Sequence, residues 1–257
     1  MTNAATAILP DLPTTLRESG EGRPVLLLHG GGGPATVQGL ADDLAGTMQV
    51  LLPTHPGWNG TPRPDWLDSI DALAMSYLRL LAERELRDVL VIGSSVGGWI
   101  AAQMAWRDTG GIVGRLVLID AAGIDVPEHP VVDFFALTPR GIAEHSYADP
   151  DRFFVDPANL PPERVAAFRG NMATLKTLAG EPYMHDPELF GRLREIEVPT
   201  LVIWGESDRV FTPGYGRAYA AAIPDATFKL IARAGHLPQI EQPAATFAAI
   251  ADFLASS

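Results

Sequence analysis

The chain has 257 residues, and its 19 basic and 31 acidic side chains give a net charge of −12. It contains no cysteine, which excludes disulfides, thiolate metal sites, iron–sulfur clusters and a cysteine nucleophile. Because there is no excess of basic side chains to offset phosphate charge, we expect no nucleic-acid partner. A hydrophobic content of 47% is typical of a globular chain that builds its own core.

The first ten residues carry neither a basic region nor a long apolar region, so they do not predict a targeting signal. No apolar run reaches the roughly 18–20 residues that span a bilayer. We therefore expect a cytoplasmic protein that binds a small molecule and no membrane. Nothing in the sequence predicts an oligomeric state.

Short aliphatic runs alternate with amphipathic segments along most of the chain. In chain order, the pattern predicts a strand at 24–29, a helix at 37–46, a strand at 49–53, a helix at 70–86, a strand at 88–92 and a helix at 96–107. Further strands are predicted at 115–119, 200–204 and 227–231, and a final helix at 243–254. Continuously aliphatic strands are buried on both faces, which indicates an α/β fold with a mostly parallel sheet between helices.

Residues 124–197 interrupt this alternation. The segment contains no convincing buried strand and is rich in proline, aromatic residues and helix-like pieces such as 162–178. We predict a core domain formed by residues 1–123 and 198–257, with 124–197 inserted as a helical lid over the carboxyl edge of the sheet. Ligands of open α/β sheets bind at that edge. A peripheral helical decoration without a role at the site is the alternative.

The run Gly93-Ser94-Ser95-Val96-Gly97 has the form G-x-S-x-G and lies between a predicted strand and a predicted helix. A sharp strand–turn–helix here would hold Ser95 in strained backbone geometry, with its hydroxyl above the sheet edge. The N–H of Val96, at the N-terminus of the helix, would point at the same place. The pattern predicts Ser95 as a nucleophile.

A serine hydroxyl needs a base to take its proton. His236 lies just past the last predicted strand, on the same edge of the sheet, and is the predicted base. A loop histidine without a role is the alternative. His29 directly precedes glycines and is expected to hold a loop through hydrogen bonds. The remaining histidines are His55, His129, His145 and His185.

Asp208 follows the predicted strand at 200–204 and is the predicted partner that orients the imidazole of His236. Nucleophile, acid and base then occur in the chain order expected for a strand-to-helix elbow. Capping of the next helix is the alternative role for Asp208. Glu206 and Asp120, which also follow predicted strands, are alternative acids.

A run of four glycines, residues 30–33, follows the first predicted strand. Glycines let the backbone approach a developing oxyanion without Cβ atoms in the way. The N–H groups of Gly31 and Val96 are therefore the predicted oxyanion hole, with Gly32 as an alternative to Gly31. The run also fits the dinucleotide fingerprint G-x-G-x-x-A, but no acid follows the next strand, as that fingerprint requires. We expect no cofactor.

Large apolar side chains in the predicted lid and near the nucleophile are candidates for the substrate pocket. They are Trp99, Phe134, Phe135, Tyr147, Met172 and Leu237. Such residues are equally able to form the core of the lid. The segment 185–188 contains metal-ligand residue types, but its proline and loop setting favour a solvated turn, so no metal site is predicted.

With these motifs in this order, the chain resembles the α/β-hydrolase superfamily with an inserted helical cap, from about residue 16 to 254. The resemblance implies a roughly eight-stranded, mostly parallel sheet, with Ser95 as nucleophile, Asp208 as acid and His236 as base. The glycine run and its preceding histidine also resemble hydrolases that cleave carbon–carbon bonds in ring-fission products. Those enzymes typically carry a tryptophan after the catalytic histidine and an active-site arginine. Here Leu237 follows the histidine, and the sequence assigns no arginine to that role.

These observations predict a serine hydrolase that cleaves small, largely apolar carboxylic esters through an acyl-enzyme intermediate. One alternative is a C–C bond hydrolase of ring-fission-type ketone products. Another is a ligand receptor or regulator that retains the same three residues, because one fold hosts many functions.

Overall fold

The structure is a computed structural model, and it describes residues 4–9 and 12–256. Residues 1–3 and 10, on which the targeting prediction partly rests, lie outside the described residues. None of the described helices is long and apolar enough to cross a bilayer.

Eight strands of the described chain form one sheet in the order β1-β2-β4-β3-β5-β6-β7-β8. They are β1 (Ala4–Leu9), β2 (Leu12–Ser19), β3 (Arg23–Leu28), β4 (Met48–Thr54), β5 (Val89–Ser94), β6 (Val113–Ile119), β7 (Thr200–Gly205) and β8 (Ala226–Ile231). β1 pairs antiparallel with β2, and β2 with β4, whereas every pair from β4 to β8 is parallel. The predicted α/β fold with a mostly parallel sheet is confirmed.

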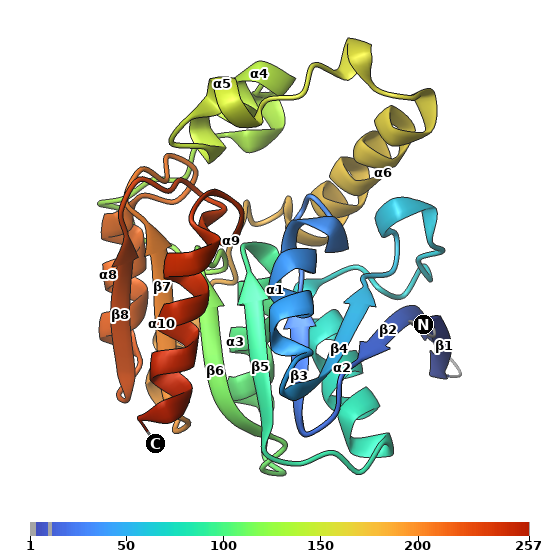
Figure 1. The fold of residues 1–257 in the computed structure, drawn as a ribbon, viewed down its shortest axis with the longest axis vertical. Helices are drawn as coiled ribbons and strands as arrows, with labels where there is room; N and C mark the ends of the chain where they lie inside the picture. The colour runs from blue at the N-terminus through green and yellow to red at the C-terminus, as the bar shows by residue number, and fades with distance from the viewer. Residues whose placement is uncertain (1–3, 10–11, 257) are drawn as a thin grey trace.

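Helices cover both faces of this sheet, as Figure 1 shows. Along β3, Val25 and Leu27 contribute to one hydrophobic core, and Leu26 and Leu28 to the other. The first core lies under α1 (Gln38–Leu44) and α10 (Pro243–Ala255), and the second under α2 (Ile70–Glu83), α3 (Val96–Arg107) and α8 (Pro213–Ala222). The short helix α9 (Pro238–Glu241) and the 3-10 turns η1 (Pro34–Val37) and η2 (Trp58–Gly60) lie in connections.

The aliphatic runs predicted the parallel strands β3 to β8, but the sequence pattern did not locate β1 and β2. These two lie at one edge of the sheet. Their sequences mix alanine, threonine and charged residues and lack the continuous aliphatic character of the central strands. An edge strand needs less apolar sequence, because less of its surface is buried.

The neighbouring strands β6 and β7 are separated in sequence by the long segment that contains residues 124–197, which we call the helical insertion. It contains η3 (Phe134–Ala136), α4 (Pro139–Ser146), α5 (Pro150–Phe153), η4 (Pro157–Asn159), α6 (Pro162–Ala179), α7 (Leu189–Arg192) and η5 (Leu193–Glu195). Figure 1 shows α4, α5 and α6 above the carboxyl ends of the parallel strands. The end of the insertion returns to the main core, where Leu189, Leu193 and Ile196 are fully buried.

Candidate active site

Ser95 lies on the turn that joins β5 to α3, with φ 56° and ψ −119°. This is a strained backbone conformation for a residue other than glycine. The flanking glycines leave no room for side chains: a Cβ on Gly93 would lie 2.1 Å from Gly97 O, and one on Gly97 would lie 2.2 Å from Leu28 O. The turn is therefore as sharp as the G-x-S-x-G pattern predicts.

Hydrogen bonds from two neighbouring segments hold this turn. Ser95 N–H donates to Ile119 O at 2.9 Å, and Ser95 O accepts from the N–H of Ala122 at 3.1 Å. Val96 is the first residue of α3, so its N–H has no intrahelical acceptor. That N–H is available to bind negative charge next to the hydroxyl of Ser95.

His236 and Asp208 come together at the same edge of the sheet, after β8 and β7. His236 Nδ1 lies 2.8 Å from Asp208 Oδ2, and both side chains are buried. The other oxygen of Asp208 accepts from the N–H groups of Val210 at 2.7 Å and Phe211 at 3.1 Å. Because the carboxylate oxygen accepts, Nδ1 of His236 carries the proton and Nε2 keeps its lone pair.

Ser95 and His236 both line one cavity. Within the described residues no hydrogen bond joins Ser95 Oγ to the imidazole. Such bonds often form only when substrate is bound. The three predicted catalytic residues are thus gathered at one place, with the acid–base pair already formed.

The two alternative acids differ in position. Glu206 is exposed, and its carboxylate accepts from the N–H of Arg233. Asp120 is fully buried at the end of β6, where Oδ1 accepts from Gly205 N–H at 2.9 Å. Burial, followed by the nearby charge of Asp208, raises the pKa of Asp120 well above its ordinary value. In the described structure, only Asp208 bonds to the imidazole of His236.

The other histidines are occupied elsewhere. His29 and His55 form a buried pair behind the glycine run. In the helical insertion, His145 Nδ1 contacts Gly141 O at 2.8 Å and His185 Nδ1 contacts Tyr183 O at 3.0 Å. His129 lies 3.4 Å from Thr212 Oγ1.

The glycine run (residues 30–33) approaches Ser95 closely. A Cβ on Gly30 would lie 2.9 Å from the Cβ of Ser95, so glycine is required there. Gly30, Gly31 and Gly32 all line the cavity. Neither Gly31 nor Gly32 has a described acceptor for its backbone N–H within the protein.

The cavity has a volume of about 560 Å³ and lies between the sheet edge and the helical insertion. Of the predicted pocket residues, Phe134, Tyr147, Met172 and Leu237 line it. Trp99 and Phe135 are not among the described lining residues, which corrects that part of the prediction. Trp99 is buried beneath Gly123, and the ring of Phe135 packs against Tyr183 with centroids 5.7 Å apart.

Helix α6 contributes a face that the sequence analysis did not assign. Its lining residues recur at helical spacing: Arg164, Ala167, Phe168, Asn171, Met172 and Leu175. Arg164 brings an exposed guanidinium to this wall, a position that the sequence analysis did not anticipate. The i, i+4, i+8 relation of Arg164, Phe168 and Met172 is the sequence signal that would have found it.

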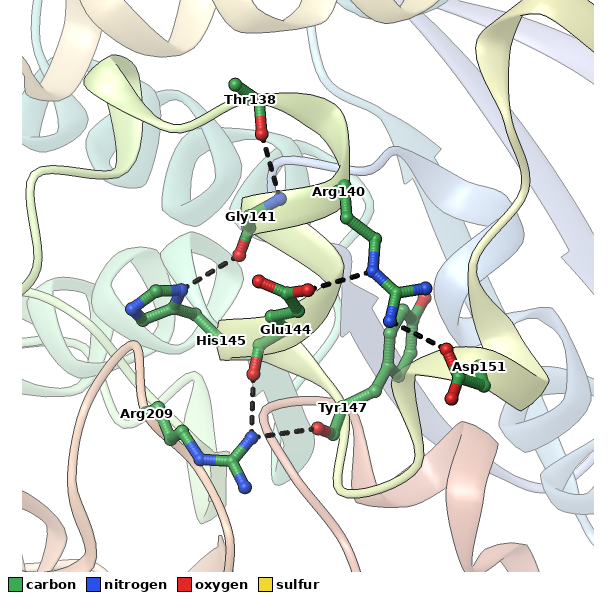
Figure 2. Close-up of polar contacts among 8 residues, drawn as sticks. All are labelled: Thr138, Arg140, Gly141, Glu144, His145, Tyr147, Asp151 and Arg209. Carbon is green, nitrogen blue, oxygen red and sulfur yellow. Dashed lines mark hydrogen bonds and ion pairs between the residues drawn. The ribbon is translucent and has the colours of Figure 1, made fainter.

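Side chains of the core domain fasten α4 beside the catalytic loop. Arg209, directly after Asp208, donates from Nη1 to Glu144 O at 2.7 Å and to Tyr147 O at 3.4 Å, as Figure 2 shows. Within the insertion, Arg140 bridges the carboxylates of Glu144 and Asp151 at 2.9 and 2.6 Å. The C-terminal end of α4 is therefore tied to the residue that follows Asp208.

The loop that carries His236 holds the same end of α4. His236 N–H donates to Ser146 O at 2.7 Å. The buried carboxylate of Glu241 accepts from the N–H of Ala148 at 2.9 Å and of Asp149 at 3.4 Å. The position of α4 is thus coupled to that of His236.

A second fastening holds α6. Asn171 Oδ1 accepts from the N–H of Asn59 at 2.7 Å, and its Nδ2 donates to Asn59 Oδ1 at 3.2 Å. One turn on, Thr174 Oγ1 donates to Gly57 O at 3.0 Å. The insertion is therefore attached to the core on both sides of the cavity.

Three known proteins illustrate what the chain is similar to. It is 28% identical, over 90% of its length and 86% of the relative's, to a 2-hydroxy-6-oxononadienedioate/2-hydroxy-6-oxononatrienedioate hydrolase of Cupriavidus pinatubonensis. It is 29% identical, over 86% of its length and 73% of the relative's, to lipase 3 of a Moraxella species. The structure of a meta-cleavage product hydrolase from Pseudomonas fluorescens superposes with a TM-score of 0.78 and 22% identity, over 95% of this chain and 94% of that one.

A model of the alpha/beta hydrolase family matches residues 25–250. That range includes the serine turn, the acid–base pair and the glycine run described above. The chain therefore belongs to the alpha/beta hydrolase family.

Proposed function

We propose that the protein is a serine hydrolase that cleaves carboxylic esters with a largely apolar portion, through an acyl-enzyme intermediate. The observation that carries this proposal is the strained turn at Ser95, which holds a serine on the wall of a cavity that the Asp208-bonded His236 also lines. Strained backbone is characteristic of catalytic positions. Hydrolase activity itself follows from the family and from the named relatives.

In this mechanism, Ser95 Oγ attacks the ester carbonyl while Nε2 of His236 takes its proton. Asp208 holds the Nδ1–H tautomer and stabilises the imidazolium that forms. The imidazolium then donates its proton to the leaving alcohol. In the second half-reaction the same nitrogen activates a water molecule, which releases the carboxylic acid and regenerates Ser95.

The negative charge on the tetrahedral intermediate needs donors that are in place before the reaction. The N–H groups of Val96 and Gly31 are suited to this role: Val96 directly follows Ser95, Gly31 lines the same cavity as Ser95, and neither N–H has a described acceptor within the protein. One such donor contributes about 3 kcal/mol to transition-state stabilisation.

The cavity supports an extended apolar substrate. A volume of about 560 Å³ lies within the range of pockets for drug-sized ligands and exceeds what a short ester needs. Phe134, Met172 and Leu237 supply apolar surface to its wall. We propose esters whose acyl or alcohol portion is a medium-length chain or an aryl group.

A C–C bond hydrolase is the second candidate, because the Cupriavidus pinatubonensis relative is named as a hydrolase of an oxo-dienedioate. Arg164 gives the cavity wall a cation that would suit a carboxylate substrate. Against this, Arg164 is exposed, and Leu237 stands next to the base. Parallel kcat/KM measurements on a p-nitrophenyl ester and a ring-fission ketone carboxylate separate the two candidates.

The test of the proposed function compares two adjacent serines. Ser95→Ala is expected to reduce kcat on p-nitrophenyl butyrate by about 10³-fold or more. Ser94→Ala is the matched control: Ser94 is buried, and its hydroxyl accepts from Gln239 Nε2 at 3.1 Å. Its activity is expected to stay near that of the wild type.

A fluorophosphonate should label the wild type and the Ser94 variant but not the Ser95 variant. Turnover that survives in Ser95→Ala would refute the assignment. Labelling of Ser95 without turnover of any ester or ketone would instead favour the receptor alternative.

A further inference from the structure

Three successive carbonyl groups at the start of the glycine run each accept a hydrogen bond from a buried aromatic ring. His29 O accepts from His55 Nε2 at 2.9 Å, and Gly30 O accepts from His29 Nδ1 at 2.7 Å. Gly31 O accepts from Trp58 Nε1 at 3.0 Å. All three rings are fully buried and none is among the described residues that line the cavity. The backbone near Ser95 is therefore held from behind.

The group that each ring nitrogen faces shows which nitrogen carries the proton. The backbone N–H of His55 donates to His29 Nε2 at 3.1 Å, so His29 carries its proton on Nδ1. His55 Nε2 faces a carbonyl and must carry the proton, which leaves Nδ1 as an acceptor. Tyr77 OH, at 2.6 Å, donates to it. Tyr77 thus donates to the ring of His55, and that ring donates to His29 O. The backbone N–H of His55 orients the ring of His29, which donates to Gly30 O.

Burial keeps both imidazoles neutral. It lowers the pKa of His55 to about 4. Burial, followed by the nearby His55, also lowers the pKa of His29 well below 6.5. Each ring therefore has one N–H and one bare nitrogen at neutral pH, so the direction of every hydrogen bond in the network is fixed. The centroids of the two rings lie 3.8 Å apart, with their planes inclined at 34°.

The carbonyl contacts decide where the next N–H points. In a trans peptide, the C=O of one residue and the N–H of the next point in opposite directions. Gly30 O accepts from the ring of His29 at 2.7 Å and also from the N–H of Gly33 at 3.1 Å, so the N–H of Gly31 points away from both donors. The cavity lies on that side, because Gly30 and Gly31 line it and the ring does not. This N–H is also near Ser95, which a Cβ on Gly30 would contact.

We propose that the buried network of Tyr77, His55 and Trp58 positions the oxyanion-binding N–H of the glycine run. None of these side chains is among the described residues that line the cavity. His55 and Trp58 act through the carbonyls of His29 and Gly31, and Tyr77 acts by donating to His55 Nδ1. The inference rests on the proposed function, since an oxyanion forms only when Ser95 attacks a carbonyl. It predicts that weakening the network impairs the transition state more than the binding of substrate.

The first test uses a pair of tyrosines. Tyr77→Phe removes one hydroxyl and keeps the buried ring, and should lower kcat on p-nitrophenyl butyrate about tenfold with KM unchanged. Tyr219→Phe is the matched control. Tyr219 is also fully buried, on α8, and its hydroxyl has no partner among the described residues. Its kcat is expected to stay at the wild-type value.

The second test uses two replacements of one residue. His55→Gln places an amide N–H near the position of Nε2, so it should keep the bond to His29 O and most of the activity. His55→Met fills similar space without a donor and should lower kcat by about tenfold or more. If His55 had only a structural role, kcat would decrease in proportion to the loss of stability in urea, whether or not the new side chain has a donor. If His55→Met fails to fold, Tyr77→Phe and His55→Gln still carry the test.

Two further readouts make the result decisive. The affinity of a trifluoromethyl ketone, which forms a hemiketal oxyanion on Ser95, should fall in parallel with kcat. Folded Tyr77→Phe and His55→Met variants with wild-type kcat and inhibitor affinity would overturn the inference. Nitrogen-15 spectra of the histidines test the proposed network without an activity assay. A wild-type His55 that carries its proton on Nδ1 would overturn the inference. Absence of ester turnover in the wild type would refute the proposed function instead.

Discussion

Replacement of Glu241 by glutamine tests the coupling between the helical insertion and the loop that carries His236. Glu241 ends α9 and is 6% exposed. One carboxylate oxygen accepts from the N–H groups of Ala148 and Asp149, and the other accepts from the N–H of Gly235, next to His236. Glutamine has a single acceptor oxygen, so it cannot serve both sides.

The magnitude follows from the bonds that are lost. In the less costly orientation, the amide oxygen of the new side chain faces Ala148 and Asp149, and its NH₂ group faces the N–H of Gly235. The charge-assisted bond from Gly235 N–H is then lost, and that N–H faces the NH₂ group of the glutamine, so two donors oppose each other. A hydrogen bond to a charged group contributes about 1.5–3 kcal/mol, and an unsatisfied buried donor costs a similar amount. We expect Glu241→Gln to lower the free energy of unfolding by about 2–4 kcal/mol.

Urea unfolding measures this change, and Glu206→Gln is the matched control. Glu206 is exposed and accepts from one N–H, that of Arg233 at 3.1 Å, so its replacement should cost about 0.5–1 kcal/mol at most. Glu241→Gln should also increase cleavage by trypsin near Arg152, because the end of α4 loosens. A difference between the two variants below about 1 kcal/mol would refute the reasoning.

Two more predictions concern Gly97, in the turn that carries Ser95, and the buried Asp120. Gly97→Ala places a Cβ 2.2 Å from Leu28 O, and the backbone there cannot move away. The free energy of unfolding should decrease by at least about 3 kcal/mol. The control is Gly39→Ala, which has open space around the new Cβ and should leave the free energy of unfolding unchanged or increase it. Asp120 holds a proton in the folded state above the pH at which the unfolded chain releases it, because its pKa is raised, so the wild type should lose stability as pH rises above about 4. Asp120→Asn holds no such proton, so its stability relative to the wild type should increase between pH 5 and pH 8; urea midpoints that move in parallel would contradict this.

The sharp turn at Ser95 and the parallel sheet could be predicted because local sequence determines them. Aliphatic runs bounded by glycine mark the central strands, and the paired glycines at 93 and 97 mark the turn, since each position leaves no space for a Cβ. The edge strands β1 and β2 lack such a signal, because their pairing depends on a neighbour and not on burial of both faces.

The walls of the site depend on tertiary contacts and were less predictable. Trp99 follows the nucleophile by four residues, yet its position on α3 turns it beneath Gly123 and away from the cavity. Arg164 lies far from the motifs in sequence, and only the packing of α6 brings it to the wall. The network behind the glycine run joins side chains from three separate segments, which no local pattern links.

The two attachments of the helical insertion have a consequence for how this protein can change. One attachment lies at residues 144–149 and the other at residues 171–174. The intervening span contributes residues to the wall of the cavity, among them Val155, which is 58% exposed. Because each end has its own hydrogen bonds to the core, the length and side chains of the span can be exchanged at small entropic cost. Substrate range can therefore diversify, in evolution or in the laboratory, by grafting roughly twenty residues while the chemistry beneath stays untouched.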